Sequence, residues 1–345
     1  MSINLAAFMT DVKRIEVREV PMPGIKADEI LLKVEYVGVC GSDVHFFETG
    51  VRKGEKFDLP FILGHECAGT VVDVGKNVHN VKSGDRICFE PQITCGLCEY
   101  CRSGRYNMCP DVVFPSVPPT HGLLQNYVAI PAYLAYRLPE NVSTLEGALM
   151  EPLCVGLAAS QRGGVSLEKS TVILGSGCIG LMTLLAAKAM GAGYTIVSDL
   201  YENRLQMALS LGADAVINAA EEQMMDKALA LLAGQGADIV FETAGNQKTA
   251  ALTTDLIRRG GVIVLVGNIG GETPYRFMDL MYKEAEIRPI YRYRNLFPTA
   301  IQMVASKKIK LDSIVSHTYA FEDVQKAFIK ASEDKQNVIK AVIRM

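Results

Sequence analysis

A glycine-rich segment near the middle of the chain constrains the fold more than any other feature of the sequence. The apolar run TVIL, residues 171–174, is followed directly by GSGCIG and then by a long apolar stretch. In a G-x-G-x-x-G pattern the first glycine permits a tight turn, the second lets a pyrophosphate approach the backbone, and the third lets a helix pack on the strand. The amide donors and dipole of a helix N-terminus favour phosphates. The segment therefore predicts a strand, turn and helix that contact a dinucleotide through Gly175, Gly177, Cys178, Ile179 and Gly180.

A second strand-like run, YTIVSD, ends in Asp199, about 20 residues beyond the glycines. A carboxylate here accepts hydrogen bonds from both hydroxyls of an adenosine ribose and repels a 2′-phosphate, so we predict NAD rather than NADP. The alternative for Asp199 is a helix-capping residue of an ordinary α/β domain. Arg204 on the following helix either packs near the adenine ribose or is a solvated helix charge.

The chain divides into two patterns. From about residue 170, short apolar runs alternate with helical stretches, which predicts a parallel, doubly wound sheet. Residues 1–150 are instead rich in strand-like runs broken by Gly, Pro and Asp. Because 345 residues exceed what one hydrophobic core usually organises, we expect two domains. We place an NAD-binding Rossmann domain at residues 154–293 and a β-rich domain at residues 1–153 and 294–345.

The composition is that of a globular protein, with 49% hydrophobic and 21% charged residues. A net charge of -3 gives no electrostatic reason to expect nucleic acid or an anionic membrane as partner. The apolar run of residues 171–190 contains turn glycines and Lys188, so we interpret it as buried strand and helix rather than a membrane span. The first residues lack the pattern of a signal peptide, which favours the cytoplasm, where clustered cysteines are metal ligands rather than disulfides.

Three short stretches carry residue types that bind metals. They are GVCGSDVHFFETG, LGHECAG and GALMEPLCVG, with the candidate residues Cys40, Ser42, Asp43, His45, His65, Glu66, Glu151 and Cys154. None has a ligand spacing that identifies a site by itself, because a lone Cys or His is more often a core residue or a satisfied polar group.

Together with the dinucleotide motif, these stretches resemble the zinc-containing medium-chain dehydrogenase/reductase family over essentially the whole chain. The resemblance rests on CGSDVH, GHECAGTVVDVG, GDRI, MEPLCVGL, GSGCIGL and SDLYENRL, in that order. It is strongest to the polyol branch, the sorbitol (L-iditol) and xylitol dehydrogenases. The resemblance implies a β-rich, GroES-like catalytic domain beside the Rossmann domain, and a homo-oligomer, either a tetramer or a dimer.

The resemblance also implies a catalytic zinc. Cys40 and His65 match its ligands, and Glu151 stands where alcohol dehydrogenases have a second cysteine, binding directly or through water. Glu66 matches a carboxylate that coordinates the zinc or hydrogen-bonds its water. Such a site keeps an open position for substrate. Cys154 lies three residues after Glu151, and we interpret it as a small buried residue.

The densest cysteine cluster matches the structural zinc lobe of the same family. Its members are Cys95, Cys98, Cys101 and Cys109. Four thiolates close a tetrahedron and leave no position for substrate, so this metal would stabilise a loop. The spacing C-x-x-C-x-x-C also occurs in iron–sulfur proteins, but nothing else in the chain indicates electron transfer, which favours zinc.

The activity implied by the resemblance is oxidation of a secondary hydroxyl of a sugar alcohol to a ketose, with hydride transfer to NAD. A proton relay would run through Ser42, the nicotinamide ribose and His45 to solvent, although a turn serine and a surface histidine are the plain alternatives. The resemblance also makes Glu66 and Glu151 catalytic residues, together with Ser42 and His45. It adds Val266 and Gly267 to the residues expected to bind NAD.

Substrate contacts are expected in the cleft between the domains. The segment YRYRNLF, residues 291–297, resembles the polyol branch and offers Arg292 and Tyr293, while Phe47 and Phe114 would form apolar walls. Arg294 and His121 are not the residues expected at these positions in the polyol branch. The extra positive charge indicates a phosphorylated or acidic polyol as substrate, unless Arg294 simply faces outward at the domain junction.

Two other interpretations stay open at this point. The first is a dehydrogenase of 2,3-butanediol, another vicinal diol or threonine. The second is a non-catalytic relative that has lost its chemistry, although Cys40, His65, Glu66 and Glu151 are all present.

Overall fold

The computed structural model describes residues 3–345, which form two compact units. The first unit comprises Met1–Glu151 and Phe297–Met345, and the second comprises Pro152–Leu296.

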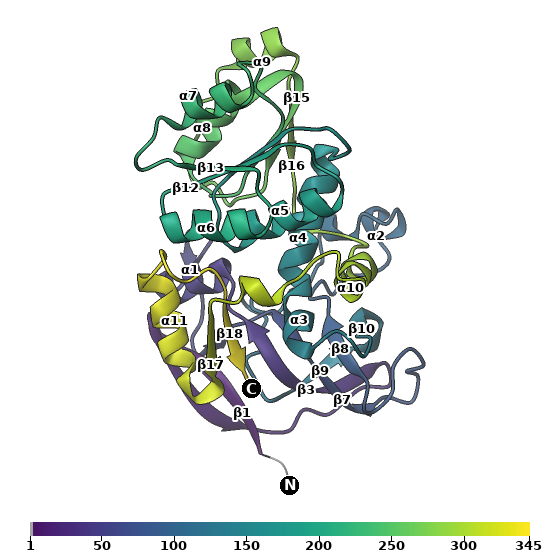
Figure 1. The fold of residues 1–345 in the computed structure, drawn as a ribbon. Coiled ribbons are helices and arrows are strands. Elements are labelled where there is room, and N and C mark those ends of the chain that lie inside the picture. Colours follow the sequence, from purple (N-terminus) through teal and green to yellow (C-terminus); the bar gives the residue numbers. More distant parts are fainter. Residues whose placement is uncertain (1–2) are drawn as a thin grey trace. The chain divides into compact units, whose positions relative to one another are not determined.

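The first unit is mainly antiparallel β-structure (Figure 1, purple to blue, and yellow). Its strands are β1 (Asn4–Asp11), β2 (Arg14–Val20), β3 (Glu29–Gly38), β4 (Val51–Arg52), β5 (Glu55–Lys56), β6 (Phe61–Ile62), β7 (Glu66–Val74), β8 (Arg86–Phe89), β9 (Tyr127–Pro131), β10 (Ala135–Arg137), β17 (His317–Ala320) and β18 (Ala341–Arg344). Its helices are α1 (Gly41–Thr49), α2 (Glu99–Arg102), α3 (Thr144–Ala148), α10 (Phe297–Ala305) and α11 (Val324–Glu333). Short 3-10 turns are η1 (Tyr106–Met108), η2 (Ala132–Leu134), η3 (Asp312–Ile314) and η4 (Phe321–Asp323).

The main sheet of this unit has the order β10-β8-β7-β3-β18-β17, and β9 also pairs with β3. A smaller sheet has the order β2-β1-β6, and β4 and β5 form a hairpin. β18, from the C-terminal segment, pairs with the end of β3, so the last residues of the chain complete the sheet built by the first ones. The inward faces of these strands and of α11 share one apolar core.

Helix α4 (Met150–Gly163) spans the boundary of the two units, and the second unit then alternates strands and helices. Its strands are β11 (Thr171–Leu174), β12 (Thr195–Asp199), β13 (Ala215–Asn218), β14 (Ala237–Glu242), β15 (Ile257–Leu265) and β16 (Glu286–Pro289). Its other helices are α5 (Cys178–Ala189), α6 (Glu202–Ser210), α7 (Met224–Leu231), α8 (Gln247–Leu256) and α9 (Phe277–Lys283).

The six strands form a parallel sheet of order β13-β12-β11-β14-β15-β16, which is the Rossmann order 3-2-1-4-5-6. Figure 1 shows α5 and α6 on one side of this sheet and α7, α8 and α9 on the other. Every residue of β11 and β14 is buried, as expected for central strands covered on both faces. The predicted doubly wound parallel sheet is therefore confirmed.

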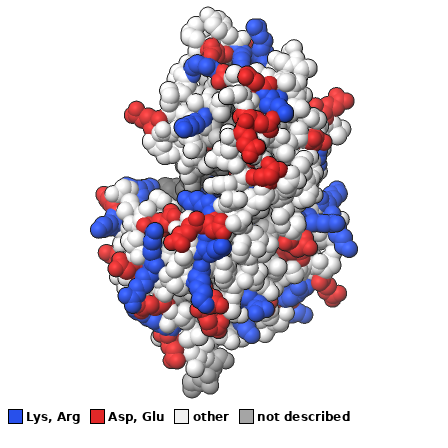
Figure 2. Space-filling model, turned by 60° about the vertical axis from the view of Figure 1, so that its left-hand side comes forward, with Lys and Arg blue, Asp and Glu red and all other residues white. Residues whose placement is uncertain are grey.

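The apolar run of residues 171–190 folds as β11, a turn and α5. Among residues 3–345, no helix is long and apolar enough to cross a membrane. On the face drawn in Figure 2, positive and negative side chains are interspersed, in keeping with the net charge of -3.

We expect Gly180→Ala to lower the free energy of unfolding by about 1–3 kcal/mol or more. A Cβ at this position would lie 1.9 Å from the backbone oxygen of Gly175, so α5 could not keep its close approach to the preceding turn. Gly270→Ala is the matched control in the same unit, because its Cβ would meet nothing within 4 Å. Urea denaturation followed by circular dichroism measures the difference, and equal stability of the two variants would refute the packing argument.

Candidate metal centres and dinucleotide site

The strand pairing of the first unit brings Cys40, His65 and Glu66 together. β3 and β7 run antiparallel with Gly38 opposite Glu66, so the end of one strand lies beside the start of the other. Cys40 follows the end of β3 as the N-cap residue of α1, and His65 immediately precedes β7. One ligand atom from each of the three side chains lies within 4.8 Å of the other two.

Gly38 makes room for the Glu66 carboxylate. A Cβ at Gly38 would lie 2.1 Å from Glu66 Oε2, so only glycine allows the side chain to lie across this strand. Glu66 is 1% exposed and forms an ion pair with Lys340, which is 2% exposed and also donates to the backbone oxygen of Val39 at 3.2 Å. A buried ion pair is costly to desolvate, and removing one partner leaves an uncompensated charge. This pair therefore holds the Glu66 carboxylate in place beside Cys40 and His65.

A buried aspartate lies behind His65. Asp43, on α1, is 0% exposed and places Oδ2 at 3.4 Å from His65 Nδ1. Its Oδ1 accepts a hydrogen bond from Ser116 Oγ at 2.5 Å, and Ser116 Oγ accepts one from the Gly64 backbone N–H at 2.9 Å. A carboxylate beside Nδ1 orients the imidazole and leaves Nε2 for a metal.

The local charges favour a cation at this cluster. Burial disfavours the charged form of His65, but the negative charges of Asp43 and Cys40 outweigh it and hold the His65 pKa well above its usual value. The surroundings that favour a proton on His65 also favour a divalent cation. The donor set of one sulfur, one nitrogen and one oxygen is typical of zinc, so these residues fit the catalytic zinc site that the sequence predicts.

The remaining residues predicted for this site have different surroundings. Glu151, in the first turn of α4, is 8% exposed and is not a member of the three-residue cluster. Cys154, on the same helix, is fully buried. Ser42 Oγ donates to Cys40 Sγ at 3.3 Å, so its hydroxyl lies against the cluster, whereas His45 is exposed.

The four clustered cysteines have the geometry of a closed metal site. The Sγ atoms of Cys95 and Cys101 are 3.9 Å apart, and those of Cys109 and Cys95 are 3.6 Å apart. With Zn–S bonds of about 2.3 Å, the sulfurs of a tetrahedron lie about 3.8 Å apart. Backbone N–H groups of Cys98 and Leu97 lower the pKa of the Cys95 thiol to about 7, which favours its thiolate form, whereas burial raises the pKa of the Cys109 thiol to about 11. The four thiols therefore fit a tetrahedral metal.

The glycine-rich turn of the second unit has the form predicted from the sequence. Gly175 has a φ of +99°, and a Cβ there would lie 3.0–3.1 Å from three atoms of Ala244. Gly177 is the N-cap residue of α5, which begins at Cys178, followed by Ile179 and Gly180. The turn therefore leaves the amides at the start of α5 in the position that the dinucleotide pattern requires.

Asp199 ends β12 beside this turn. Its Oδ2 accepts hydrogen bonds from the backbone N–H of Ser176 at 2.7 Å and from Ser176 Oγ at 3.0 Å. Arg204 Nη1 lies 4.0 Å from the same oxygen, and its guanidinium lies over the Tyr201 ring, 5.4 Å from the centroid. With 15% of its side chain exposed, Arg204 is not a fully solvated charge.

Val266 and Gly267 follow β15, and their N–H groups both donate to the backbone oxygen of Glu242 at 2.9 Å. A Cβ at Gly267 would lie 2.3 Å from the backbone nitrogen of Gly245, so this loop packs tightly on the loop after β14. The two loops lie at the carboxyl ends of neighbouring parallel strands, the edge at which open α/β sheets bind ligands.

The candidate substrate residues divide between the units. In the first unit, Phe114 is 8% exposed, with its ring 5.3 Å from that of His65. Phe47 is 0% exposed and packs on Phe328 of α11, which makes it a core residue and gives no support to a substrate contact. Arg292 and Tyr293 belong to the second unit, where Tyr293 is 2% exposed and Arg292 has a φ of 57°.

Sequence reasoning missed the surroundings of the metal cluster. It named Asp43 as a metal-ligand type but gave it no part beside His65, and it did not name Ser116 or Lys340. Ser116 lies 73 positions from its partner Asp43 in the sequence. Lys340 lies more than 270 positions from its partner Glu66. Only the three-dimensional structure brings them together.

Two family models match the chain. "Alcohol dehydrogenase GroES-like domain" matches residues 26–140, and "Zinc-binding dehydrogenase" matches residues 178–306. The two matches confirm the predicted combination of a GroES-like domain with a Rossmann domain.

Known proteins match nearly the full length. The uncharacterized zinc-type alcohol dehydrogenase-like protein YdjJ of Escherichia coli (strain K12) is 45% identical over 95% of this chain and 94% of its own. Sorbitol dehydrogenase of Bacillus subtilis (strain 168) is 38% identical over 98% of this chain and 96% of its own. L-Idonate 5-dehydrogenase of Vitis vinifera is 36% identical over 99% of this chain and 95% of its own.

Two solved structures are also similar. An oxidoreductase/dehydrogenase of unknown specificity from Escherichia coli matches with a TM-score of 0.94 at 42% identity, over 99% of each chain. The 2R,3R-butanediol dehydrogenase of Bacillus subtilis matches with a TM-score of 0.90 at 26% identity, over 99% of each chain. The chain thus belongs to the zinc-containing medium-chain dehydrogenase/reductase family, among its sorbitol dehydrogenase relatives, and is an oxidoreductase that acts on CH–OH groups with zinc and a nicotinamide dinucleotide as cofactors.

Proposed function

We propose that this protein is an NAD-dependent polyol dehydrogenase that oxidises a secondary hydroxyl of a sugar alcohol to a ketose. The observation that carries the proposal is the cluster of Cys40, His65 and Glu66, a mixed donor set in a chain 38% identical to a sorbitol dehydrogenase. Three donors leave at least one position of a tetrahedral zinc for substrate or water. A donor set with one thiolate leaves the metal harder than a set with two, which suits a diol oxygen.

In this proposal the residues around the cluster have separate tasks. Zinc, when bound, acts as a Lewis acid that lowers the pKa of a substrate hydroxyl toward neutrality. Asp43 orients His65, and Lys340 holds the Glu66 carboxylate. Glu151 supplies a further carboxylate, directly or through water.

The proton that leaves the substrate must reach solvent. The Ser42 hydroxyl lies against Cys40, and the exposed His45 lies three residues further along α1. We assign both to a relay that would carry this proton from the substrate hydroxyl to solvent. In the second unit, the turn of residues 175–180 receives the pyrophosphate and Asp199 receives the adenosine ribose.

A second candidate function is oxidation of a vicinal diol such as 2,3-butanediol. It is favoured by the similarity to the butanediol dehydrogenase structure at 26% identity. Threonine and phosphorylated polyols are further candidates of the same reaction type.

The test of the proposed function is NADH formation with sorbitol, xylitol, L-iditol, galactitol, 2,3-butanediol and threonine. We expect turnover with at least one of the hexitols or pentitols, because the proposed zinc site accepts a secondary hydroxyl with a neighbouring hydroxyl. The release of NADH is followed by absorbance, and removal of zinc with a chelator should abolish it. Turnover with butanediol or threonine alone would reject the polyol assignment.

Cys98→Ser should reduce thermal stability and the zinc content, from about two ions per chain to about one. The expected cause is loss of one thiolate from the closed set, which removes the metal that stabilises residues 95–109. Metal analysis and the thermal midpoint measure the two effects, with chelator-treated wild-type protein as reference. A stable variant that keeps its zinc and loses only turnover would mean that this cluster takes part in the chemistry.

Asp199→Asn should reduce the preference for NAD over NADP by roughly 10- to 100-fold, the range expected for a hydrogen bond to a charged group. The amide keeps an acceptor for Ser176 but no longer repels a 2′-phosphate. Steady-state kcat/KM with each cofactor measures the preference. Asp214→Asn is the control, because Asp214 accepts the N–H of Thr195 at the opposite end of β12. A wild-type enzyme that prefers NADP would contradict the role given to Asp199.

A further inference from the structure

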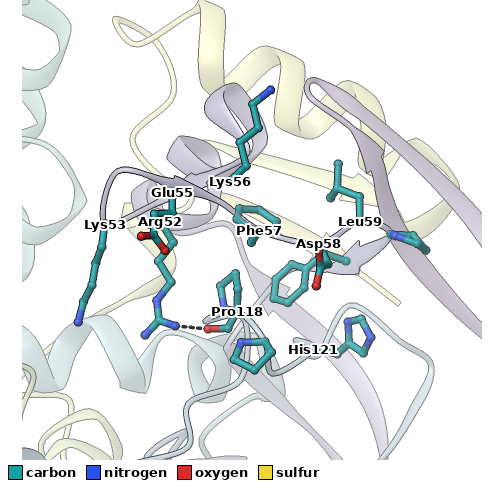
Figure 3. A pocket seen from close by; sticks show the side chains of 12 residues that line it. Arg52, Lys53, Glu55, Lys56, Phe57, Asp58, Leu59, Pro118 and His121 are labelled. Carbon is teal, nitrogen blue, oxygen red and sulfur yellow. Dashed lines mark hydrogen bonds between the residues drawn. The ribbon is translucent and has the colours of Figure 1, made fainter.

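A cavity of about 510 Å³ in the first unit lies between the β4–β5 hairpin and the loop that contains Pro118 and His121 (Figure 3). The charged side chains that line it are Arg52, Lys53, Lys56, Glu55 and Asp58. Because cations and carboxylates share the lining, the cavity favours neither an anion nor a cation and identifies no ligand.

Glu242 in the second unit is a fully buried carboxylate that neither metal centre contains. It is the last residue of β14 and is 0% exposed. Its Oε1 accepts a hydrogen bond from the backbone N–H of Gly245 at 3.0 Å and from Thr249 Oγ1 at 2.8 Å. The backbone N–H of Asn246 donates to the same oxygen at 3.4 Å. The carboxylate is thus bound to the loop after β14 and to the first turns of α8.

This carboxylate is costly to bury. Burial raises the pKa of the Glu242 carboxyl above its usual value, and the hydrogen bonds from Thr249, Asn246 and Gly245 offset part of that effect. Its donors are neutral groups, and within residues 3–345 no lysine or arginine forms an ion pair with it. A buried charge held without a cation is unfavourable for folding and is typical of functional sites.

Capping of α8 does not account for Glu242. The Asn246 side chain already caps this helix, because it accepts the backbone N–H of Lys248 at 2.8 Å. The main effect of the Glu242 carboxylate is therefore on the loop that precedes the helix.

Glu242 joins the loop after β14 to the loop after β15. Its side chain binds Gly245, while its backbone oxygen accepts the N–H groups of Val266 and Gly267, both at 2.9 Å. A Cβ at Gly267 would lie 2.7 Å from Glu242 Oε2, so the second loop packs directly on the carboxylate. The spacing of the two loops thus depends on this one residue.

The glycine-rich turn has an anchor of its own. Thr243 Oγ1 lies 2.9 Å from the backbone oxygens of both Leu174 and Gly175, and Ala244 lies against Gly175. These contacts do not involve the Glu242 carboxylate. Its loss should therefore disturb the residues from Gly245 onward more than the turn of residues 175–180.

The strand order indicates which part of a dinucleotide meets the two loops. β12, which ends in Asp199, lies on one side of β11, whereas β14 and β15 lie on the other side. A Rossmann sheet binds a dinucleotide across the carboxyl ends of its strands, with the pyrophosphate at the glycine-rich turn after the first strand. With the adenosine ribose at Asp199, the nicotinamide half extends over the ends of β14 and β15.

We propose that Glu242 is a positioning residue for the nicotinamide, which holds the loops after β14 and β15 at the spacing in which they contact the ring. The inference rests on the proposed placement of the adenosine ribose at Asp199. Glu242 itself does not touch the cofactor, because its carboxylate is fully buried. It acts through Gly245, Val266 and Gly267.

The test measures binding of NADH and of ADP-ribose to the zinc-loaded protein by isothermal titration calorimetry, without any alcohol. ADP-ribose lacks only the nicotinamide ring, so the ratio of the two dissociation constants reports the contacts of the ring. Glu242→Gln removes the charge and one acceptor oxygen. It should weaken NADH binding by about fivefold or more and ADP-ribose binding by about twofold at most.

Asp238→Asn is the matched control on the same strand. Asp238 lies near the opposite end of β14, is 8% exposed and accepts the backbone N–H and the hydroxyl of Ser170 at 2.9 and 2.8 Å. This variant should lower the stability of the unit and leave the ratio of the dissociation constants unchanged.

Thr249→Val is the second variant and keeps the proposal testable if Glu242→Gln does not fold. It removes one donor to the Glu242 carboxylate. The ratio should shift in the same direction as in Glu242→Gln, by about threefold.

Three outcomes would overturn the proposal. Glu242→Gln could weaken NADH and ADP-ribose equally, which would make the residue a support of the fold alone. Asp238→Asn could change the ratio as much as Glu242→Gln does. The wild-type protein could bind ADP-ribose as tightly as NADH, which would leave no ring contact to position. Because no alcohol is present, a lack of turnover with every sugar alcohol would reject the proposed function and leave this inference standing.

Discussion

The antiparallel pairing of β3 with β7 is the constraint on which the candidate zinc site depends. This pairing places Gly38 opposite Glu66. The same register positions the two other candidate ligands, because Cys40 lies just after the end of β3 and His65 just before the start of β7. A shift of one residue would turn every side chain of β7 to the other face of the sheet. The pairing of β18 with the same end of β3 then brings Lys340 to Glu66. Residues scattered over 300 positions thus meet because the end of β3 lies beside the starts of both β7 and β18.

The two cysteine-containing sites illustrate opposite ways to build a metal centre. The cluster of residues 95–109 is local, and its short turns place backbone N–H groups on its sulfurs, as with the Cys98 N–H at 3.4 Å from Cys95 Sγ. Its four thiols fit around one ion. The cluster at Cys40 is assembled by tertiary structure, and its ligand set is mixed and smaller. Dense ligands in sequence therefore indicate a closed site, whereas reactivity requires that a position be left for substrate.

The sequence predicts the features that are encoded locally and misses those that tertiary structure assembles. The Rossmann unit was predictable because strand, turn and helix are encoded side by side in residues 171–190, and Gly180 has a packing reason that can be read locally. The cysteine cluster was visible for the same reason. Asp43, Ser116 and Lys340 had no local signal, since each acts on a partner brought by the fold. Phe47, an aromatic residue near a metal ligand in sequence, is buried in the core against Phe328, and nothing in its sequence neighbourhood indicates this packing.

Charge balance explains why a lysine can be buried beside a zinc site. Once Cys40 is a thiolate, the cluster and its neighbours hold three negative groups with Asp43 and Glu66, against the single ammonium of Lys340. An excess of two negative charges in a buried site is unfavourable unless cations compensate it. Burial of the ring disfavours its charged form, but the negative charges of Asp43 and Cys40 outweigh this and hold the pKa of His65 well above its usual value. A divalent ion compensates the same excess and leaves His65 neutral, as a ligand must be. Without Lys340, the three groups Cys40, Asp43 and Glu66 would carry one negative charge more than a divalent ion neutralises.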